Sequence, residues 1–125
     1  YENNEKFADK SLFEGAKDVV LSDFLSINET VNITQNDYVV ILTRGHQSDN
    51  EVLRQVMSKH PSYLGVIGSR KKVAAMQKFL SECGFDDEEI KRIHSPIGIE
   101  IGAETPSEIA VSITAQLIHH RASNR

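Results

Sequence analysis

Three short apolar runs most restrict what this chain can fold into. They are DVVL at residues 18–21, YVVIL at 38–42 and YLGVI at 63–67. None of the three alternates apolar with polar residues, and the first two are rich in β-branched side chains. Continuous apolar runs of this length are typical of β-strands that are covered on both faces. A sheet with helices on its faces would provide that cover.

Stretches with helical periodicity separate and follow these runs, at residues 49–60, 70–83 and 106–121. Strands that alternate with helices predict a parallel sheet, because parallel neighbours need a crossover connection. The predicted fold class is therefore α/β, and the last helix is expected to be largely buried. A chain of 125 residues has room for one ordinary domain, so we expect residues 1–125 to form a single unit.

Two of the predicted helices begin with conventional signals. Ser48 and Glu51 are spaced as a capping box, and Thr105 and Glu108 repeat that spacing with Pro106 at the first helical position. The helix near residue 70 begins differently, because its first turn holds three cations and no acid. The start of a helix carries partial positive charge, so cations there are disfavoured by about 0.3–1 kcal/mol each.

The segment from Gly68 to Lys72 can be interpreted as an anion site. Gly68 permits close backbone approach, Ser69 can cap the helix, and Arg70 can hold two oxygen atoms at once. Lys71 and Lys72 add charge beside the free backbone N–H groups. The alternative is that the three cations simply lie in solvent, and the segment by itself does not decide between the two.

The turn after the preceding apolar run carries a second set of candidate residues. Thr43, Arg44, Gly45, His46 and Asp49 lie there, and in a parallel sheet this turn would neighbour the one at Gly68, at the edge where α/β folds bind ligands. His46 and Asp49 could orient one another or cap the helix. No further His, Cys or acidic residue stands at metal-ligand spacing, so no metal site is predicted.

A long loop precedes the last predicted helix and supplies the remaining candidates. Gly98 and Gly102 permit tight turns, and Thr105 closes the loop. Ile97, Ile99 and Ile101 alternate, so they could pack inward on one side. The loop can be the wall of a ligand pocket beside Thr105, or an extended connection held in place by its isoleucines.

The composition excludes several classes of function. With 14 Lys and Arg against 18 Asp and Glu the net charge is −4, so nucleic-acid binding is not expected, although residues 38–85 hold a local basic surplus. No apolar run is long enough for a membrane helix, and a lone Cys83, expected to be buried, fits a reducing cytoplasm. His60, His119 and His120 lie near predicted helix ends and are given no chemical role.

Three motifs occur in order: T-R-G-H-x-x-D, G-S-R-x-K and P-I-G-x-x-I-G-A-x-T-P-x-E-I-A. Together they resemble the C-terminal Rossmann-like domain of the xanthine dehydrogenase accessory proteins, the XdhC/CoxI family, over most of residues 7–121. The resemblance implies a Rossmann-like parallel sheet whose first strand and glycine-rich loop are lacking here, which makes the chain an N-terminally truncated fragment of that domain. Glu2 stands where the family has an acidic residue that binds hydroxyl groups.

The resemblance also implies a function. The protein would bind molybdenum cofactor, as molybdopterin or its dinucleotide form, and deliver it to a xanthine dehydrogenase-type apoenzyme with the help of a sulfur donor. It would act in the cytoplasm of a bacterium as a cofactor chaperone rather than as an enzyme. The alternative is an NAD(P)-binding Rossmann domain of an oxidoreductase. An exposed sheet edge would favour a homo-oligomer.

Overall fold

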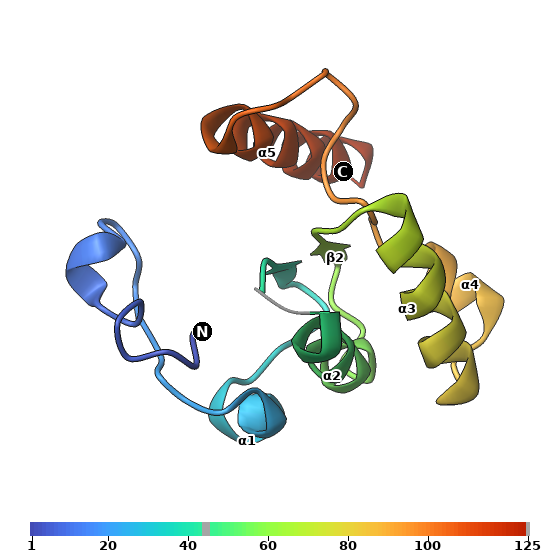
Figure 1. Ribbon diagram of the computed structural model, residues 1–125, viewed down its shortest axis with the longest axis horizontal. Helices are drawn as coiled ribbons and strands as arrows, with labels where there is room; N and C mark the ends of the chain where they lie inside the picture. The colour runs from blue at the N-terminus through green and yellow to red at the C-terminus, as the bar shows by residue number, and fades with distance from the viewer. Residues whose placement is uncertain (44–45, 125) are drawn as a thin grey trace.

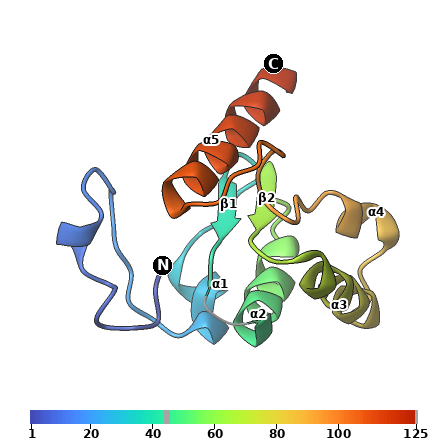
Figure 2. The same cartoon turned by 45° about the horizontal axis from the view of Figure 1, so that its top comes forward.

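The fold is an α/β arrangement in which helices flank a short parallel sheet (Figure 1). The computed structural model describes residues 1–43 and 46–124, without the side chains of His46 and Gln47. In both Figure 1 and Figure 2, α5 lies at the top, α3 and α4 lie on the right, and the N-terminal segment lies on the left. The elements are η1 (Lys10–Leu12), η2 (Phe24–Ser26), α1 (Ile27–Thr30), β1 (Tyr38–Ile41), α2 (His46–Met57), β2 (Tyr63–Val66), α3 (Arg70–Glu82), α4 (Asp87–Lys91) and α5 (Pro106–Ser123).

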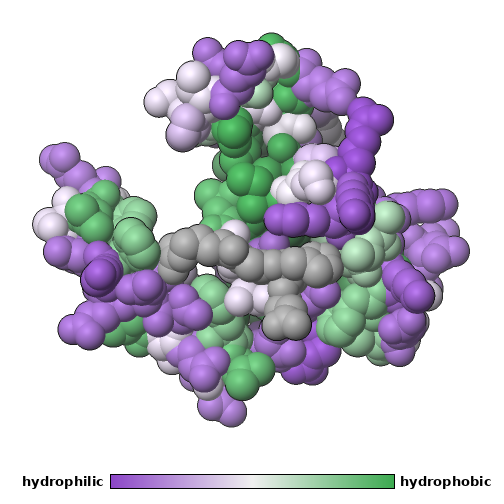
Figure 3. Space-filling model, in the orientation of Figure 1, coloured by the Kyte–Doolittle hydropathy of each residue, from purple (hydrophilic) through white to green (hydrophobic). Residues whose placement is uncertain are grey.

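The two strands confirm the predicted parallel sheet. Tyr38 pairs with Tyr63 and Ile41 with Val66, in parallel register. All four residues of β2 are buried, as the apolar run predicts. In β1, however, Tyr38 is 39% exposed and Val40 37% exposed, so the expectation that this strand is covered on both faces is wrong. Figure 3 shows apolar surface at the centre of this face, between α5 and the N-terminal segment.

The run at residues 18–21 does not form the predicted strand. Leu21 makes a single parallel bridge to Glu2 and is 52% exposed. Backbone bonds from Glu2 N to Val20 O and from Ser22 N to Glu2 O hold this contact. A β-branched run becomes a strand when a neighbouring strand pairs along it, and within the described residues only this bridge does so.

Helix α2 begins and ends three residues earlier than predicted. Because it starts at His46, Ser48 lies inside the helix and is not an N-cap, so the predicted capping box is wrong. The helix ends at Met57, and His60 takes a positive φ of 50° just before Pro61. The residue before a proline is disfavoured in the helical region, so the helix cannot readily continue to Pro61.

The helices α3 and α5 match their predictions closely. Ser69 caps α3, and Thr105 and Glu108 form the predicted capping box of α5. The expectation that α5 is largely buried is wrong, because Val111 is 61% exposed and Ile118 51% exposed. One face of α5 contacts the loop before it. The short helix α4 and its capping box were not anticipated from periodicity.

The core lies between the sheet, α2, α3 and α4. Its centre is formed by Leu53 and Leu80, which are fully buried, and α1 adds Ile27 from the other side of α2. Cys83 is exposed, because it is the C-cap residue of α3, so the expectation of a buried thiol is wrong. Across the described part of the chain, no helix combines the length and the apolar character needed to cross a bilayer.

Candidate functional site

The candidate site is the edge of the sheet where both strands end. Because β1 and β2 are parallel and in register, the chain leaves them on the same side, at Thr43 and at Gly68 (Figure 2). This is the edge at which open α/β sheets bind ligands. Arg44 and Gly45 lie outside the described residues, as does the side chain of His46, so their predicted contacts remain predictions.

A hydrogen bond joins the two ends of the turn after β1. The hydroxyl Oγ1 of Thr43 donates to Oδ1 of Asp49, in the first turn of α2. Asp49 is only 7% exposed, so its carboxylate is largely withdrawn from water and needs such partners. This contact fixes the turn against α2.

A narrow crevice connects this turn to the one after β2. It is lined by Asp49 and Asn50 of α2, by Gly68 and Lys72, and by Ser95, and its volume is about 10 Å³. That is room for about one water molecule, so a cofactor would lie over the crevice and not within it. The amide oxygen Oδ1 of Asn50 is buried and has no hydrogen-bond partner among the described residues. In a space of this size, a water molecule is the donor that suits such an acceptor.

The start of α3 has the electropositive character that the sequence predicts. Ser69 Oγ accepts the backbone N–H of Lys72 at 3.3 Å, and no acid stands in the first turn. Nη2 of Arg70 lies 3.4 Å from Oε1 of Glu100, and both side chains are almost fully exposed. An exposed pair of this kind contributes little stability and can open when a competing anion arrives. The anion interpretation and the solvated interpretation are both consistent with this geometry.

Two of the three candidates from the loop before α5, Gly98 and Thr105, make internal contacts. Gly98 exchanges two hydrogen bonds with the side chain of Gln116, at 3.0 and 3.3 Å. Thr105 Oγ1 accepts the N–H of Glu108 at 3.2 Å, as the helix cap. Gly102 has a positive φ of 73° and open space around it. The Arg70–Glu100 pair joins this loop to the candidate site, while ligand contacts of the three residues remain predictions.

Glu2 lies in the N-terminal segment, on the left in Figure 2. Its backbone bridges to Leu21, and Oε1 accepts the N–H groups of Asn3 and Asn4 at 3.1 Å each. A carboxylate that accepts two backbone N–H groups is held in one orientation. Its role with ligand hydroxyls remains a prediction.

Two sets of polar contacts position α5, one with Tyr63 at the start of β2 and one at the start of the helix itself. Tyr63 donates its hydroxyl to Oε1 of Gln116 at 2.5 Å, and burial raises the pKa of Tyr63 to about 12. Backbone N–H groups of Glu104 and Thr105 hold the pKa of Glu108 below its usual value. The first contact ties β2 to α5, and the second fixes the loop at its junction with the helix.

Sequence reasoning gave no role to a second group of residues that the structure brings together. The structure brings together His60 from the turn after α2, His94 from the segment after α4 and His120 from the last turns of α5, and all three line a larger cavity. They are 26 or more residues apart in the chain, so no local spacing could have linked them. Among the described residues no set of three metal-binding side chains is arranged to hold an ion.

Comparison with known proteins gives three relatives, two of which have names that state a role. The chain is 38% identical over 90 residues to the uncharacterised Escherichia coli protein YqeB, covering 72% of this chain and 16% of that protein. It is 28% identical over 115 residues to a probable xanthine dehydrogenase component of Bacillus subtilis, covering 92% and 33%. It is 26% identical over 95 residues to the molybdenum cofactor insertion chaperone PaoD of Escherichia coli, covering 76% and 30%.

A solved structure and a family model agree with these relatives. The crystal structure described as a xanthine dehydrogenase from Bacillus halodurans matches with a TM-score of 0.84 and 28% identity, over 99% of this chain and 35% of that one. The chain thus spans a third or less of the three relatives and about a third of the solved chain. The model of the XdhC Rossmann domain matches residues 1–117. The chain therefore belongs to the XdhC Rossmann domain family.

Proposed function

We propose that this protein binds molybdenum cofactor at the edge where β1 and β2 end, and delivers it to a xanthine dehydrogenase-type molybdoenzyme. Two named relatives support the proposal: one is called a molybdenum cofactor insertion chaperone and the other a probable component of a xanthine dehydrogenase. In this role the cofactor is cargo, so the protein acts as a chaperone and not as a catalyst. A sulfur donor and a homo-oligomeric state belong to the same proposal.

The observation that carries the proposal is the start of α3. Its first backbone N–H groups, of which Ser69 caps that of Lys72, stand beside the exposed side chains of Arg70, Lys71 and Lys72. Molybdenum cofactor ends in a phosphate, or in a dinucleotide, and a helix start with bidentate arginine nearby is well suited to hold such an anion. The weak pair with Glu100 leaves Arg70 able to exchange its partner.

The crevice beside this helix start is too small for the pterin ring, so the ring would lie across its mouth. The buried oxygen Oδ1 of Asn50 lacks a donor within the described residues, and it suits a water molecule that bridges to the N–H donors on the edge of the ring. Asp49 lies next to it in the crevice lining. The residues present therefore fit the phosphate directly, at Arg70, and the ring edge through a water molecule held by Asn50.

An anaerobic titration tests this function. Pterin fluorescence and absorption are followed as molybdenum cofactor is added, with NAD and NADP in parallel titrations. We expect saturable, one-to-one binding of the cofactor and much weaker binding of both nicotinamide dinucleotides. The loaded protein should then activate a cofactor-free xanthine dehydrogenase-type apoenzyme. Binding of NAD or NADP without binding of the cofactor would contradict the proposal and favour the oxidoreductase alternative.

A further inference from the structure

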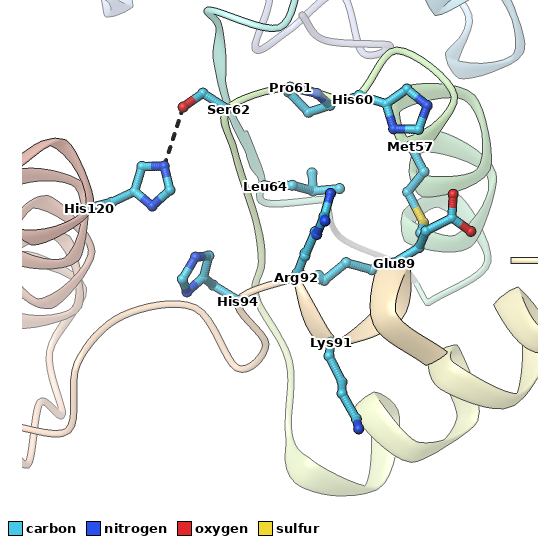
Figure 4. A pocket seen from close by; sticks show the side chains of 11 residues that line it. Met57, His60, Pro61, Ser62, Leu64, Glu89, Lys91, Arg92, His94 and His120 are labelled. Carbon is cyan, nitrogen blue, oxygen red and sulfur yellow. Dashed lines mark hydrogen bonds between the residues drawn. The ribbon is translucent and has the colours of Figure 1, made fainter. Parts of the chain in front are cut away.

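The larger cavity lies at the opposite end of β2. It has a volume of about 420 Å³ and is bordered by the end of α2, the first residues of β2, α4 and the last turns of α5 (Figure 4). That volume is in the range of pockets for small organic ligands. Ser62, just before β2, lines it, whereas Gly68 of the candidate cofactor site follows β2. Six extended residues separate the two by about 20 Å, so the two sites do not overlap.

The floor of this cavity is apolar and rigid. Met57, Leu64 and Ile93 line it and are only 6%, 7% and 8% exposed. Leu64 belongs to the buried strand β2, and all three belong to the core cluster. A floor of this kind favours an apolar or aromatic ligand body, because contact with it removes apolar surface from water.

Arg92 supplies the positive charge at the rim of the cavity. Arg92 points toward Leu64 in Figure 4, while Lys91 points away. Among the described residues Arg92 makes no ion pair. The one acid in the lining, Glu89, already uses its carboxylate to accept the N–H of Asp86 at 3.0 Å. An anion entering the cavity would therefore meet a guanidinium that has no carboxylate partner within the described part of the chain.

Two histidines on the rim are held in place by the protein. The ring of His94 stacks on Tyr63 with centroids 4.6 Å apart and planes at 13°, and its backbone bridges to Leu64 and Val66. Nε2 of His120 lies 3.3 Å from Oγ of Ser62, which Figure 4 marks with a dashed line. Preorganised polar groups around an apolar floor are the usual construction of a small-molecule site.

We propose that this cavity binds a small molecule that has a planar apolar body and one carboxylate or phosphate group. Arg92 pairs with the anion, and Met57 and Leu64 contact the body. The site is separate from the one proposed for molybdenum cofactor, and neither proposal depends on the other. A phosphate and a carboxylate share the same recognition chemistry here, because guanidinium binds both bidentately.

Three probes of nearly equal shape test the proposal: benzoate, benzamide and benzamidine, which are anionic, neutral and cationic. The ring signals of His94 and His120 in NMR spectra report occupancy, and phenyl phosphate replaces benzoate in a second arm. We expect benzoate or phenyl phosphate to shift both histidine signals saturably, with a dissociation constant in the millimolar range. Benzamidine should not bind. Equal shifts from all three probes, or none from either anion, would overturn the proposal.

Arg92→Gln tests the assigned anion partner. We expect it to raise the dissociation constant of the anionic probe by about tenfold or more, the usual loss for one charge-assisted contact. Arg54→Gln is the matched control, because Arg54 is exposed, pairs with Glu51 and lies outside the cavity lining. Equal effects of the two variants would refute the role of Arg92. The titration of the wild-type protein tests the proposal even if a variant fails to fold. If molybdenum cofactor competed with the anionic probe, the separation of the two sites would be refuted.

Discussion

Replacing Leu53 with alanine is expected to lower the free energy of unfolding by about 2–5 kcal/mol. Leu53 is fully buried in α2 and belongs to the core cluster that joins this helix to the sheet. The substitution removes apolar contacts and leaves a cavity that the closely packed surroundings refill only in part. Denaturant unfolding followed by circular dichroism measures the change.

Leu25→Ala is the matched control for Leu53. Leu25 is 67% exposed, so the same change in side chain removes little buried area. Its free energy of unfolding should stay within about 0.5 kcal/mol of the wild-type value, which is usual for surface substitutions. Equal stability of the two variants would contradict the described packing of α2 on the sheet. It would also contradict the placement of Thr43 and Asp49, which depends on that packing.

Gly98→Ala is expected to cost about 2–5 kcal/mol of stability, from backbone strain and overpacking together. Gly98 has a φ of 97°, a region that side-chain-bearing residues avoid, and an added Cβ would collide with the hydroxyl of Ser112. The positive φ contributes roughly 1–2 kcal/mol and the overpacking roughly 1–3 kcal/mol. That hydroxyl donates to the carbonyl of Ile99 at 2.6 Å, so it cannot move without losing its bond.

Gly84 offers a control that separates the two causes. Its φ is also 97°, but nothing lies within 4 Å of the position of an added Cβ. Gly84→Ala should therefore show the backbone strain alone, about 1–2 kcal/mol. Adding Ser112→Ala to Gly98→Ala should recover part of the loss, since the colliding oxygen is gone. Equal losses for the two glycine variants, without rescue, would contradict the packing of this loop against α5.

The apolar runs of the sequence predicted the sheet only where the chain also supplies a neighbour. The runs at 38–42 and 63–67 pair with one another and became β1 and β2. The run at 18–21 is similarly apolar, yet only Leu21 finds a partner, in Glu2. Residue type reports the tendency to form a strand, whereas pairing depends on residues far away in the chain.

Helix starts were predictable where the capping residues are decisive. Thr105 with Pro106 fixed the start of α5, and Ser69 caps α3. At α2 the spacing of Ser48 and Glu51 was misleading, because the helix already begins at His46. The five residues of α4 are too few for periodicity, although Asp86 and Glu89 form a capping box that could have indicated it.

The candidate cofactor site was predictable because its parts follow consecutive strands. Thr43, Asp49 and Gly68 end up at one edge of the sheet, since parallel strands bring successive turns together. The cavity around Arg92 was not predictable from the sequence, because its histidines come from three segments that are distant in the chain. Only the packing of α5 against the sheet brings His120 near His94, with ring centroids 5.9 Å apart.

The most direct test of the cofactor proposal is the dissociation constant of molybdenum cofactor for Arg70→Glu. We expect it to rise about 10- to 100-fold, because a charge-assisted contact to the phosphate is lost and a repulsive one replaces it. Lys78→Glu is the control, since Lys78 is also exposed on α3 but lies two turns beyond the helix start. An unchanged constant for Arg70→Glu, or an equal rise for Lys78→Glu, would contradict the binding of the cofactor at this edge.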